Sequence, residues 1–596
     1  MRKTVKVSDY IVDFFVNNNI NKCFVVTGGG AMHMNDSFGH SKDVQCIYNH
    51  HEQASAMSAE GYTRVSGNPA IVSVTSGPGT TNALTGVLGA WLDSIPMVIL
   101  SGQMNFDTTI ESTPVPLRQL GFQEFNIIDS VKPMTKYAEM VEDPRYIAYH
   151  LEKALFLSQN GRKGPVWLDI PLNVQSAVID VDDLIHYKSP SLFSGDFDMD
   201  LIFDKLNQAK KPVLFAGYGV RMSDSYKTFL KVVSKLKIPV VTEWNSNDLI
   251  WSDHDYYAGR AGTIGDRGGN FVVQNSDLLL CVGCQFSIRQ LSYRWENFAK
   301  GAYKIAVDVD ENELVKPIVK IDYPIHSDVG VFLDSVLLSD NSSVHDYSSK
   351  WNTWTRDINN KYPVVSDRHL SQKSPLSIYS FMKSLSECLT EDDVVVIANG
   401  AACVAGLQAI NIKEGQRVFT NAGASSMGYG IAAAIGSCYA KEKVICIEGD
   451  GSIQMNLQEL QTIAHNNLNV KIIWINNDGY QSIKQTQASM FEAEKRGYCG
   501  ANCDSGIGFP SAEKIAKAYG LNFYKIDHVD DMKSTLEIFY DSDGPAICEV
   551  VTIPDEKFEP KLQSKLLNDG TFQTPSLEDM YPFLSRDEME ENIFIP

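Results

Sequence analysis

Two short polar motifs near residues 450 and 477 could together hold a metal ion and phosphate groups. Gly449-Asp450-Gly451-Ser452 follows an apolar run, and Asn476-Asn477-Asp478-Gly479 follows a second one. At the carboxyl end of a parallel strand, with a helix predicted over Ile453–His465, such a turn directs backbone N–H groups at phosphate oxygens. Ser452 could cap that helix or donate to a phosphate oxygen.

The two motifs complement each other if their strands are neighbours. Asp450 and Asn477 would then meet at one edge of the sheet and offer a carboxylate and an amide oxygen. Hard oxygen ligands combined with phosphate oxygens suit Mg²⁺. A Gly-Asp-Gly turn alone is usually only a tight turn, and it is the second motif that favours a magnesium diphosphate site.

A third candidate group lies far away in the sequence. Glu52 opens a predicted helix directly after Tyr48-Asn49-His50-His51, and small residues follow it. Its carboxylate is either a favourable anion in the first helical turn or a group that exchanges protons with a ligand.

Composition excludes several classes of function. The chain has 596 residues, with 52 Lys+Arg and 73 Asp+Glu, and its formal charge is −21. We therefore expect no nucleic-acid partner, because phosphate neutralisation needs clustered basic residues. We expect no membrane span, because no apolar run is long enough, and no secretory leader, because Asp9 and Asp13 interrupt the first apolar residues. The 11 cysteines lack framework spacing, which indicates reduced thiols and a cytoplasmic protein.

Alternating strand-like and helix-like segments predict an α/β protein with three doubly wound parallel-sheet domains and a C-terminal arm. The predicted strands are Lys22–Thr27, Val44–Ile47, Ala70–Thr75, Met97–Ser101 and Pro165–Ile170; then a second unit that starts at Lys211–Gly219 and continues at Pro239–Thr242, Leu278–Val282 and Lys304–Asp308; and finally Val394–Ala398, Val444–Glu448, Val470–Asn476 and Ala546–Val551. The predicted domains are 1–185, a central nucleotide-binding-like domain at 195–340, and 365–555, with an arm or lid at 556–596. Turn-forming residues at 186–200 and Ser339–Ser349 mark the connectors.

The chain resembles the thiamine diphosphate enzymes. Gly-Asp-Gly, a gap of 24 residues from 452 to 475, and Asn-Asn form the motif that carries this resemblance. It implies that Mg²⁺ is held by Asp450, the Asn477 side chain and the Gly479 carbonyl. It also implies that Glu52 hydrogen-bonds N1′ of the cofactor's aminopyrimidine, in a pyrimidine-binding first domain opposite a diphosphate-binding third domain.

Further motifs are similar to the acetolactate synthase branch, which includes pyruvate oxidase and glyoxylate carboligase. They are Ala59-Glu60-Gly61-Tyr62, the segment 74–82 with Ser76-Gly77-Pro78-Gly79, and the segment 91–103. The resemblance implies that Met427 supports the bent cofactor, although a core methionine is the alternative, and that Gln123 lies near the reacting carbons. His51, with His50, is either a proton-transfer group or structural. The other implied cofactor contacts are Gly29, Gly30, Gly400, Gly449, Gly451, Ser452, Asn477 and Tyr480.

Departures from the family pattern fall on the acceptor side. Thr486 stands where acetolactate synthases carry an acceptor-selecting tryptophan, and Gly400-Ala401-Ala402-Cys403 replaces Gly-Gln-His-Gln. We expect an acceptor that differs from that of acetolactate synthase. Lys484, Gln485 and Gln487 could seat a larger, hydroxylated or anionic one, as in similar enzymes of surface-polysaccharide and branched-sugar pathways.

The implied activity is decarboxylation of a 2-oxo acid, with pyruvate as the expected donor, and transfer of the acyl carbanion to a carbonyl acceptor. Acetolactate synthase, pyruvate oxidase and a non-catalytic regulatory or scaffold subunit are the alternatives. The implied cofactors are thiamine diphosphate and Mg²⁺, while FAD, ADP or no nucleotide in the central domain stays open. The expected assembly is a homodimer or homotetramer with active sites between the first domain of one subunit and the third of another.

Overall fold

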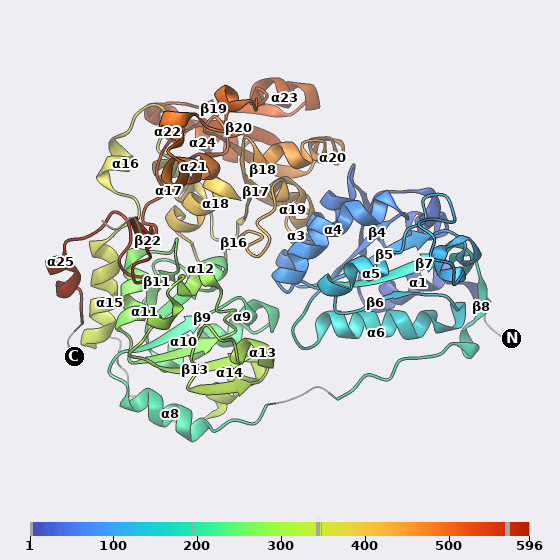
Figure 1. The fold of residues 1–596 in the computed structure, drawn as a ribbon, viewed down its shortest axis with the longest axis horizontal. Coiled ribbons are helices and arrows are strands. Elements are labelled where there is room, and N and C mark those ends of the chain that lie inside the picture. The colour runs from blue at the N-terminus through green and yellow to red at the C-terminus, as the bar shows by residue number, and fades with distance from the viewer. Residues whose placement is uncertain (1–3, 192–194, 341–345, 347–348, 567–571, 595–596) are drawn as a thin grey trace.

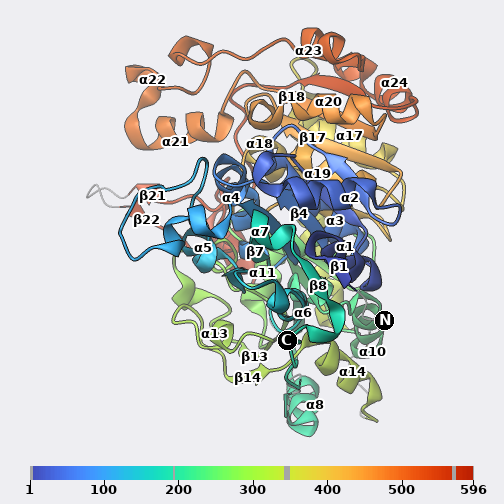
Figure 2. The same cartoon turned by 90° about the vertical axis from the view of Figure 1, so that its right-hand side faces the viewer.

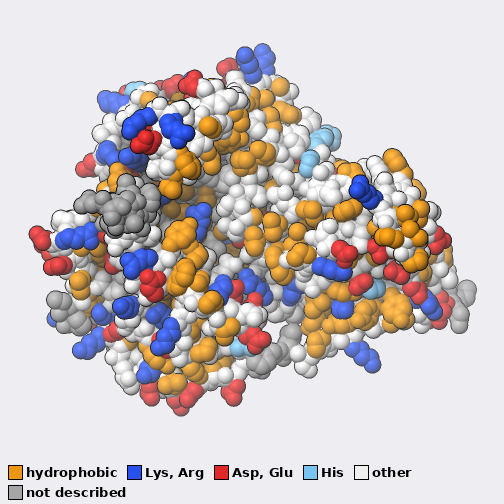
Figure 3. Space-filling view, in the orientation of Figure 1, with side chains coloured by type: hydrophobic (Ala, Val, Ile, Leu, Met, Phe, Trp, Pro, Cys, Tyr) orange, Lys and Arg blue, Asp and Glu red, His pale blue; other side chains and the backbone are white. Residues whose placement is uncertain are grey.

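The computed structural model describes residues 4–191, 195–340, 346, 349–566 and 572–594. Three domains follow one another along the chain, each with a six-stranded parallel sheet between helices (Figure 1). The predicted fold class is therefore confirmed. No helix in the described ranges is long and apolar enough to cross a bilayer. On the face shown in Figure 3, basic and acidic side chains are interspersed.

The N-terminal domain has the strand order β3-β2-β4-β5-β7-β6, with a short β1–β8 pair beside it. Its central strands are buried on both faces, which is why they appear in the sequence as continuous apolar runs. Its elements are β1 Thr4–Lys6, α1 Val7–Asn17, β2 Lys22–Val25, η1 Gly29–Ala31, α2 Met32–His40, β3 Gln45–Tyr48, α3 Glu52–Ser66, β4 Ala70–Val74, α4 Pro78–Leu92, β5 Met97–Gln103, α5 Ile128–Val131, β6 Ala138–Met140, α6 Ile147–Gln159, β7 Val166–Pro171, α7 Leu172–Gln175 and β8 Val178–Asp180.

The middle domain repeats this plan with the order β11-β10-β9-β12-β13-β14. Its elements are α8 Met199–Gln208, β9 Pro212–Ala216, α9 Gly219–Met222, α10 Tyr226–Leu236, β10 Val240–Glu243, β11 Tyr257–Ala261, α11 Arg267–Asn275, β12 Leu278–Val282, α12 Ile288–Leu291, β13 Tyr303–Asp308, α13 Glu311–Leu314, β14 Tyr323–His326, α14 Val329–Leu338 and α15 Lys350–Lys361. Residues 192–194 of the first predicted connector and 341–345 and 347–348 of the second lie outside the described residues.

The C-terminal domain has the order β16-β15-β17-β18-β20-β19. Its elements are α16 Asp367–Ser371, α17 Ile378–Cys388, β15 Val394–Ile397, α18 Gly400–Ala409, β16 Arg417–Phe419, α19 Tyr429–Cys438, β17 Lys443–Gly449, η9 Ser452–Asn456, α20 Glu459–His465, β18 Asn469–Asn476, α21 Gln481–Phe491, α22 Ala493–Arg496, α23 Ala512–Tyr519, β19 Asn522–Ile526, α24 Val529–Tyr540 and β20 Ala546–Val551. The chain turns from β15 to β16 on one side while β17 lies on the other. The carboxyl ends of β15 and β17 thus form the switch point where open sheets bind ligands.

The C-terminal segment runs back over the middle domain. Arg267 donates to the carbonyls of Met580 (3.2 Å) and Pro582 (2.6 Å), and Phe594 packs edge-on against Trp351. The segment contains β21 Lys565–Leu566, β22 Phe572–Gln573 and α25 Arg586–Glu591.

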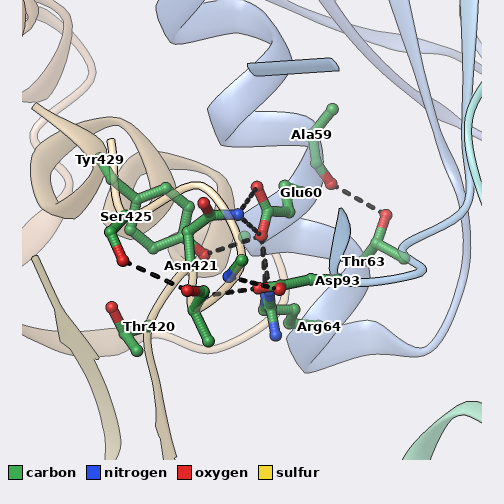
Figure 4. A network of polar contacts seen from close by, with 12 residues as sticks. Ala59, Glu60, Thr63, Arg64, Asp93, Thr420, Asn421, Ser425 and Tyr429 are labelled. Carbon is green, nitrogen blue, oxygen red and sulfur yellow. Dashed lines mark hydrogen bonds and ion pairs between the residues drawn. The ribbon is translucent and has the colours of Figure 1, made fainter. Parts of the chain in front are cut away.

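Helices α3 and α19 join the N-terminal and C-terminal domains at very close range. A Cβ atom at Gly436 would lie 1.7 Å from the Ser58 carbonyl oxygen, and one at Gly61 would lie 2.2 Å from that of Ala433. Beside them Arg64 binds Glu60 (2.7 Å) and Asp93 (2.5 Å) in a buried network (Figure 4). Small residues thus let two backbones touch, and a buried ion cluster fixes their register.

Gly436→Ala should destabilise the protein, because the added methyl group meets backbone rather than a side chain that could move aside. We expect a loss of about 1–3 kcal/mol, or more, in the free energy of unfolding. Chemical denaturation checks this result. Gly508→Ala is the matched control, since nothing lies within 4 Å of its Cβ position. Equal stability of the two variants would contradict the packing described above.

Asp169 is a buried carboxyl group on β7. Its oxygens accept from Ser101 Oγ (2.5 Å) and Gln103 Nε2 (3.0 Å), and burial raises the pKa of Asp169 to about 7. The folded state therefore holds a proton that the unfolded state has already lost between about pH 4 and about pH 7. The protonated Asp169 therefore contributes to the free energy of unfolding. This contribution is complete below the pKa of the unfolded state and disappears as pH rises through the pKa of the folded state.

Removing this proton should change how stability depends on pH. The free energy of unfolding of the wild type minus that of Asp169→Asn should fall by about 1.4 kcal/mol per pH unit, at most, between about pH 5 and about pH 7. Urea titrations at both ends of this range measure the difference. A constant difference would mean that Asp169 is ionised throughout.

Candidate active site

The turns after β17 and β18 lie side by side, because Gly449 pairs with Ile475 in the parallel ladder. The Asp450 carboxylate accepts from the N–H groups of Gly451 (2.7 Å), Gly479 (3.1 Å) and Asn477 (3.2 Å). Burial raises the pKa of Asp450 to about 7, and these N–H groups act in the opposite direction. The structure thus brings together the two motifs that the sequence singles out.

Asn477 supplies an oxygen without a partner. Its Nδ2 donates to Gln481 Oε1 (2.8 Å), while Oδ1 is buried and accepts no hydrogen bond from any described residue. A buried amide oxygen without a donor is costly, and a metal ion would satisfy it. Because the backbone N–H of the same residue bonds the Asp450 carboxylate, the donor set fits a Mg²⁺ ion whose remaining ligands come from a phosphate-bearing molecule.

Glycine is required at two places in these turns. Gly479 has φ +128°, and a Cβ there would lie 2.1 Å from the Ala501 carbonyl oxygen. A Cβ at Gly451 would lie 2.2 Å from the Tyr480 ring, which packs across the turn. The Tyr480 ring therefore packs directly against the Gly-Asp-Gly turn.

The segment after the Gly-Asp-Gly turn differs from the prediction. Instead of one helix over Ile453–His465, the chain forms the 3-10 turn η9 and then α20. Ser452 caps neither element; its Oγ accepts from the Gly428 N–H (3.0 Å). Ser452 is the first residue of η9, so the N-cap position falls on Gly451 and the Ser452 hydroxyl bonds the neighbouring loop instead. The predicted capping role was wrong.

The other predicted residues of this domain surround the switch point. Gly400 begins α18 with φ +64°, and Met427 is half-buried just before α19. The Cβ position of Gly449 is open, with no atom within 4 Å. The structure therefore leaves space above the carboxyl ends of β15 and β17.

Glu52 begins α3 in the N-terminal domain. Its side chain is 8% exposed, and Oε2 accepts from Asn82 Nδ2 (2.9 Å) on α4. His51 is the N-cap of the helix, where its Nδ1 accepts from the Gln53 N–H (3.1 Å). This geometry supports the structural alternative for His51. Asn82 is a partner of Glu52 that sequence reasoning missed.

Gly29 and Gly30 follow β2 at the switch point of their own sheet. Gly30 donates its N–H to Thr75 Oγ1 (3.0 Å), and the Cβ position of Gly29 is open. Gln123 has φ +60° in an exposed loop, whose neighbour Phe122 is 82% exposed. Within the described chain, no hydrogen bond or ion pair joins Glu52 to Asp450, Asn477 or Gly479.

Three consecutive parts of the chain match known domains. Residues 5–129 match the thiamine pyrophosphate enzyme N-terminal TPP binding domain, 199–336 match the central domain, and 398–550 match the C-terminal TPP binding domain. The chain belongs to the thiamine pyrophosphate enzymes. The predicted resemblance is therefore confirmed, and the protein is an enzyme of the acetolactate synthase-like type.

Curated relatives cover nearly the whole length of this enzyme. Acetolactate synthase isozyme 1 large subunit of Escherichia coli (strain K12) is 29% identical over 567 residues, covering 94% of this chain and 96% of its own. The acetolactate synthase large subunit of Lactococcus lactis is 29% identical over 576 residues, covering 96% of each chain. The chloroplastic acetolactate synthase of Arabidopsis thaliana is 28% identical, covering 95% of this chain and 84% of its own.

The helices α21 and α22 of this thiamine pyrophosphate enzyme project from the C-terminal domain (Figure 2). The polar residues expected to seat the acceptor are already engaged there. Lys484 pairs with Asp555 (2.6 Å), Gln485 donates to the Glu556 carbonyl (2.9 Å), and Gln487 bonds the Cys499 backbone. Thr486 instead lies on an exposed face with Ile483 and Met490. The acceptor role proposed for the three polar residues is therefore not supported.

A cavity of about 600 Å³ lies at the switch point between β9 and β12 of the middle domain. Its lining includes Glu243 and Asp308, and burial raises the pKa of these groups to about 8 and about 7. The basic residues Arg162 and Lys163 also line it but pair with Glu313 (2.6 Å) and Asp224 (2.8 Å). Gly217 and Gly283, which follow β9 and β12, pack against each other, since a Cβ at Gly217 would lie 2.1 Å from the Gly283 carbonyl oxygen. The lining therefore suits hydroxyl groups better than a diphosphate.

Sequence reasoning missed Glu448 beneath the metal turn. It is fully buried on β17, where Oε2 accepts from the Ile431 N–H (3.3 Å) and Oε1 has no partner. Burial raises the pKa of Glu448 to about 7. A charged residue as the last member of an apolar run was the available signal.

Proposed function

We propose that this enzyme decarboxylates a 2-oxo acid, with pyruvate as donor, and joins the acyl fragment to a carbonyl acceptor. The observation that carries the proposal is the pair formed by the Asp450 carboxylate and the unpartnered Asn477 Oδ1 at the sheet edge. The similarity to acetolactate synthases supports carboligation as the reaction class.

In this proposal, Asp450, Asn477 Oδ1 and the Gly479 carbonyl hold Mg²⁺, which binds the diphosphate of thiamine diphosphate. Open space at Gly449 accommodates the diphosphate, Gly400 contacts it from the start of α18, and Met427 contacts the rings. When bound, the cofactor supplies a carbon nucleophile and an electron sink. Glu52 holds a proton at N1′ of the aminopyrimidine, since it is desolvated and oriented by Asn82.

We propose a homodimer, or a dimer of dimers, as the active form, with Glu52 of one subunit facing Asp450 of another. Among the described residues, no hydrogen bond or ion pair joins these groups within one chain, which is consistent with this arrangement. The strongly exposed Phe122, beside Gln123, supports a partner that covers this loop. A cytoplasmic location is part of the same proposal.

We propose that any nucleotide in the middle cavity serves a structural role, because carboligation needs no redox step. The carboxyl groups of Asp308 and Glu243 suit ribose hydroxyls, whereas the paired Arg162 and Lys163 offer little to the diphosphate of FAD. Bleaching of a bound flavin when pyruvate is added would overturn this structural role.

A product assay tests the donor and identifies the acceptor. The enzyme is incubated with thiamine diphosphate, Mg²⁺ and pyruvate, first alone and then with a panel of aldehydes, 2-oxo acids and nucleotide-linked keto sugars. Mass spectrometry then identifies the products. We expect CO₂ release and a two-carbon extension of one added acceptor. Acetolactate from pyruvate alone would favour acetolactate synthase, acetate with flavin reduction would favour pyruvate oxidase, and no pyruvate turnover would overturn the proposal.

A further inference from the structure

Glu459 is a buried carboxylate at the interface between the C-terminal and N-terminal domains. It begins α20 and is 0% exposed. Its Oε1 accepts from the His50 N–H (2.9 Å), and its Oε2 accepts from Asn49 Nδ2 (3.0 Å) and Thr462 Oγ1 (2.7 Å). Among the described residues, no cation lies within ion-pair distance of it.

Burying a carboxylate without a cation is costly unless its hydrogen bonds do something that an apolar contact could not. Domain association does not need it, because α3 and α19 pack backbone to backbone, and Glu60 and Asp93 accept hydrogen bonds from the C-terminal domain. Two of the three donors to Glu459 come instead from residues 49 and 50, three and two residues before Glu52.

A continuous path joins the Gly-Asp-Gly turn to the start of α3. Along the chain, the turn is followed by η9 and then by α20, which Glu459 begins. The Glu459 carboxylate in turn accepts hydrogen bonds from Asn49 and His50. Asn49 Oδ1 accepts from Ser55 Oγ (3.2 Å), so the same amide also fixes the first turn of α3, which Glu52 begins. The position of the Glu52 carboxylate is thus set from one side by Asn82 and from the other by Glu459 through this loop.

We propose that Glu459 is a positioning residue for Glu52, which couples the helix after the metal-binding turn to the loop that carries the cofactor-activating carboxylate. This inference rests on the proposed function. It predicts that loss of Glu459 leaves cofactor affinity and fold nearly unchanged but misplaces Glu52.

The test exchanges the chemical groups of Glu459 and Asn49. In Glu459→Gln the NH₂ group of the new amide faces the NH₂ group of Asn49, so that two donors oppose each other. In Glu459→Gln/Asn49→Asp a carboxylate and an amide again face each other, reversed. We expect the single variant to lower kcat about 10- to 100-fold, equivalent to losing a charge-assisted hydrogen bond. The apparent affinity for thiamine diphosphate should change less than about threefold, and the double variant should recover most of kcat.

Amide hydrogen exchange of the cofactor-free protein provides a readout independent of turnover. Residues 49–55 should exchange faster in Glu459→Gln and return toward the wild-type rate in the double variant. Equal loss of kcat without faster exchange, or no rescue by the reversed pair, would overturn the positioning role. If the wild type itself fails to turn over pyruvate while the exchange results hold, the proposed function fails and the coupling between Glu459 and the loop stands.

Discussion

Glu52→Gln should reduce turnover of pyruvate by about 10²- to 10⁴-fold, the usual contribution of a positioned proton-transfer group. Glutamine keeps the shape of the side chain. Its Oε1 can still accept the hydrogen bond that Asn82 Nδ2 donates to Glu52 in the wild type (2.9 Å). What it loses is the ability to hold and release a proton. Steady-state kinetics with pyruvate, together with exchange of the cofactor's C2 proton followed by NMR, measure this effect.

Two controls separate this loss from misfolding. Thermal unfolding and thiamine diphosphate affinity of Glu52→Gln should stay close to the wild type, because neither the fold nor the metal turn is touched. Glu139→Gln makes the same change at an exposed carboxylate in the same domain and should leave turnover unaltered. Normal turnover by Glu52→Gln would refute the mechanism proposed for this enzyme.

Asp450→Asn should weaken Mg²⁺-dependent cofactor binding by at least about 100-fold, since a hard anionic ligand becomes a neutral amide. The cost is enlarged by the local hydrogen bonds. Asp450 receives three backbone N–H groups, and the amide nitrogen of asparagine would oppose one or more of them. Titration with thiamine diphosphate at several Mg²⁺ concentrations, monitored by tryptophan fluorescence, measures the change.

Asp478, which follows Asn477 in the second turn, offers a matched control. Asp478→Asn is the same substitution 28 residues further along the chain, at an exposed side chain in the second turn. We expect its effect on cofactor affinity to be within about twofold, as for ordinary surface charges. Similar losses in the two variants would mean that the general charge of this edge, rather than coordination by Asp450, governs binding.

Apart from the edge strand β3, the strands that the sequence predicts are the ones buried inside the sheets. Strands such as β4, β12 and β17 are continuous apolar runs because helices cover both of their faces. In the three six-stranded sheets, the strands not predicted are β6, β11, β14, β16 and β19, and each lies at an edge of its sheet. An edge strand is partly exposed, so residues such as Lys525 in β19 interrupt the apolar pattern.

The sequence by itself determined the family, the three parallel-sheet domains, and the pairing of Asp450 with Asn477, because short spacings and strand order fix which turns meet. Only the tertiary structure decided what depends on contacts over long separations. These are the engagement of Lys484, Gln485 and Gln487 in packing, the partners of Ser452 and Glu52, and the bond from Glu459 to a loop 409 residues earlier. Periodicity and local spacing carry no information about such contacts, since they arise only when the packing of whole domains brings the side chains together.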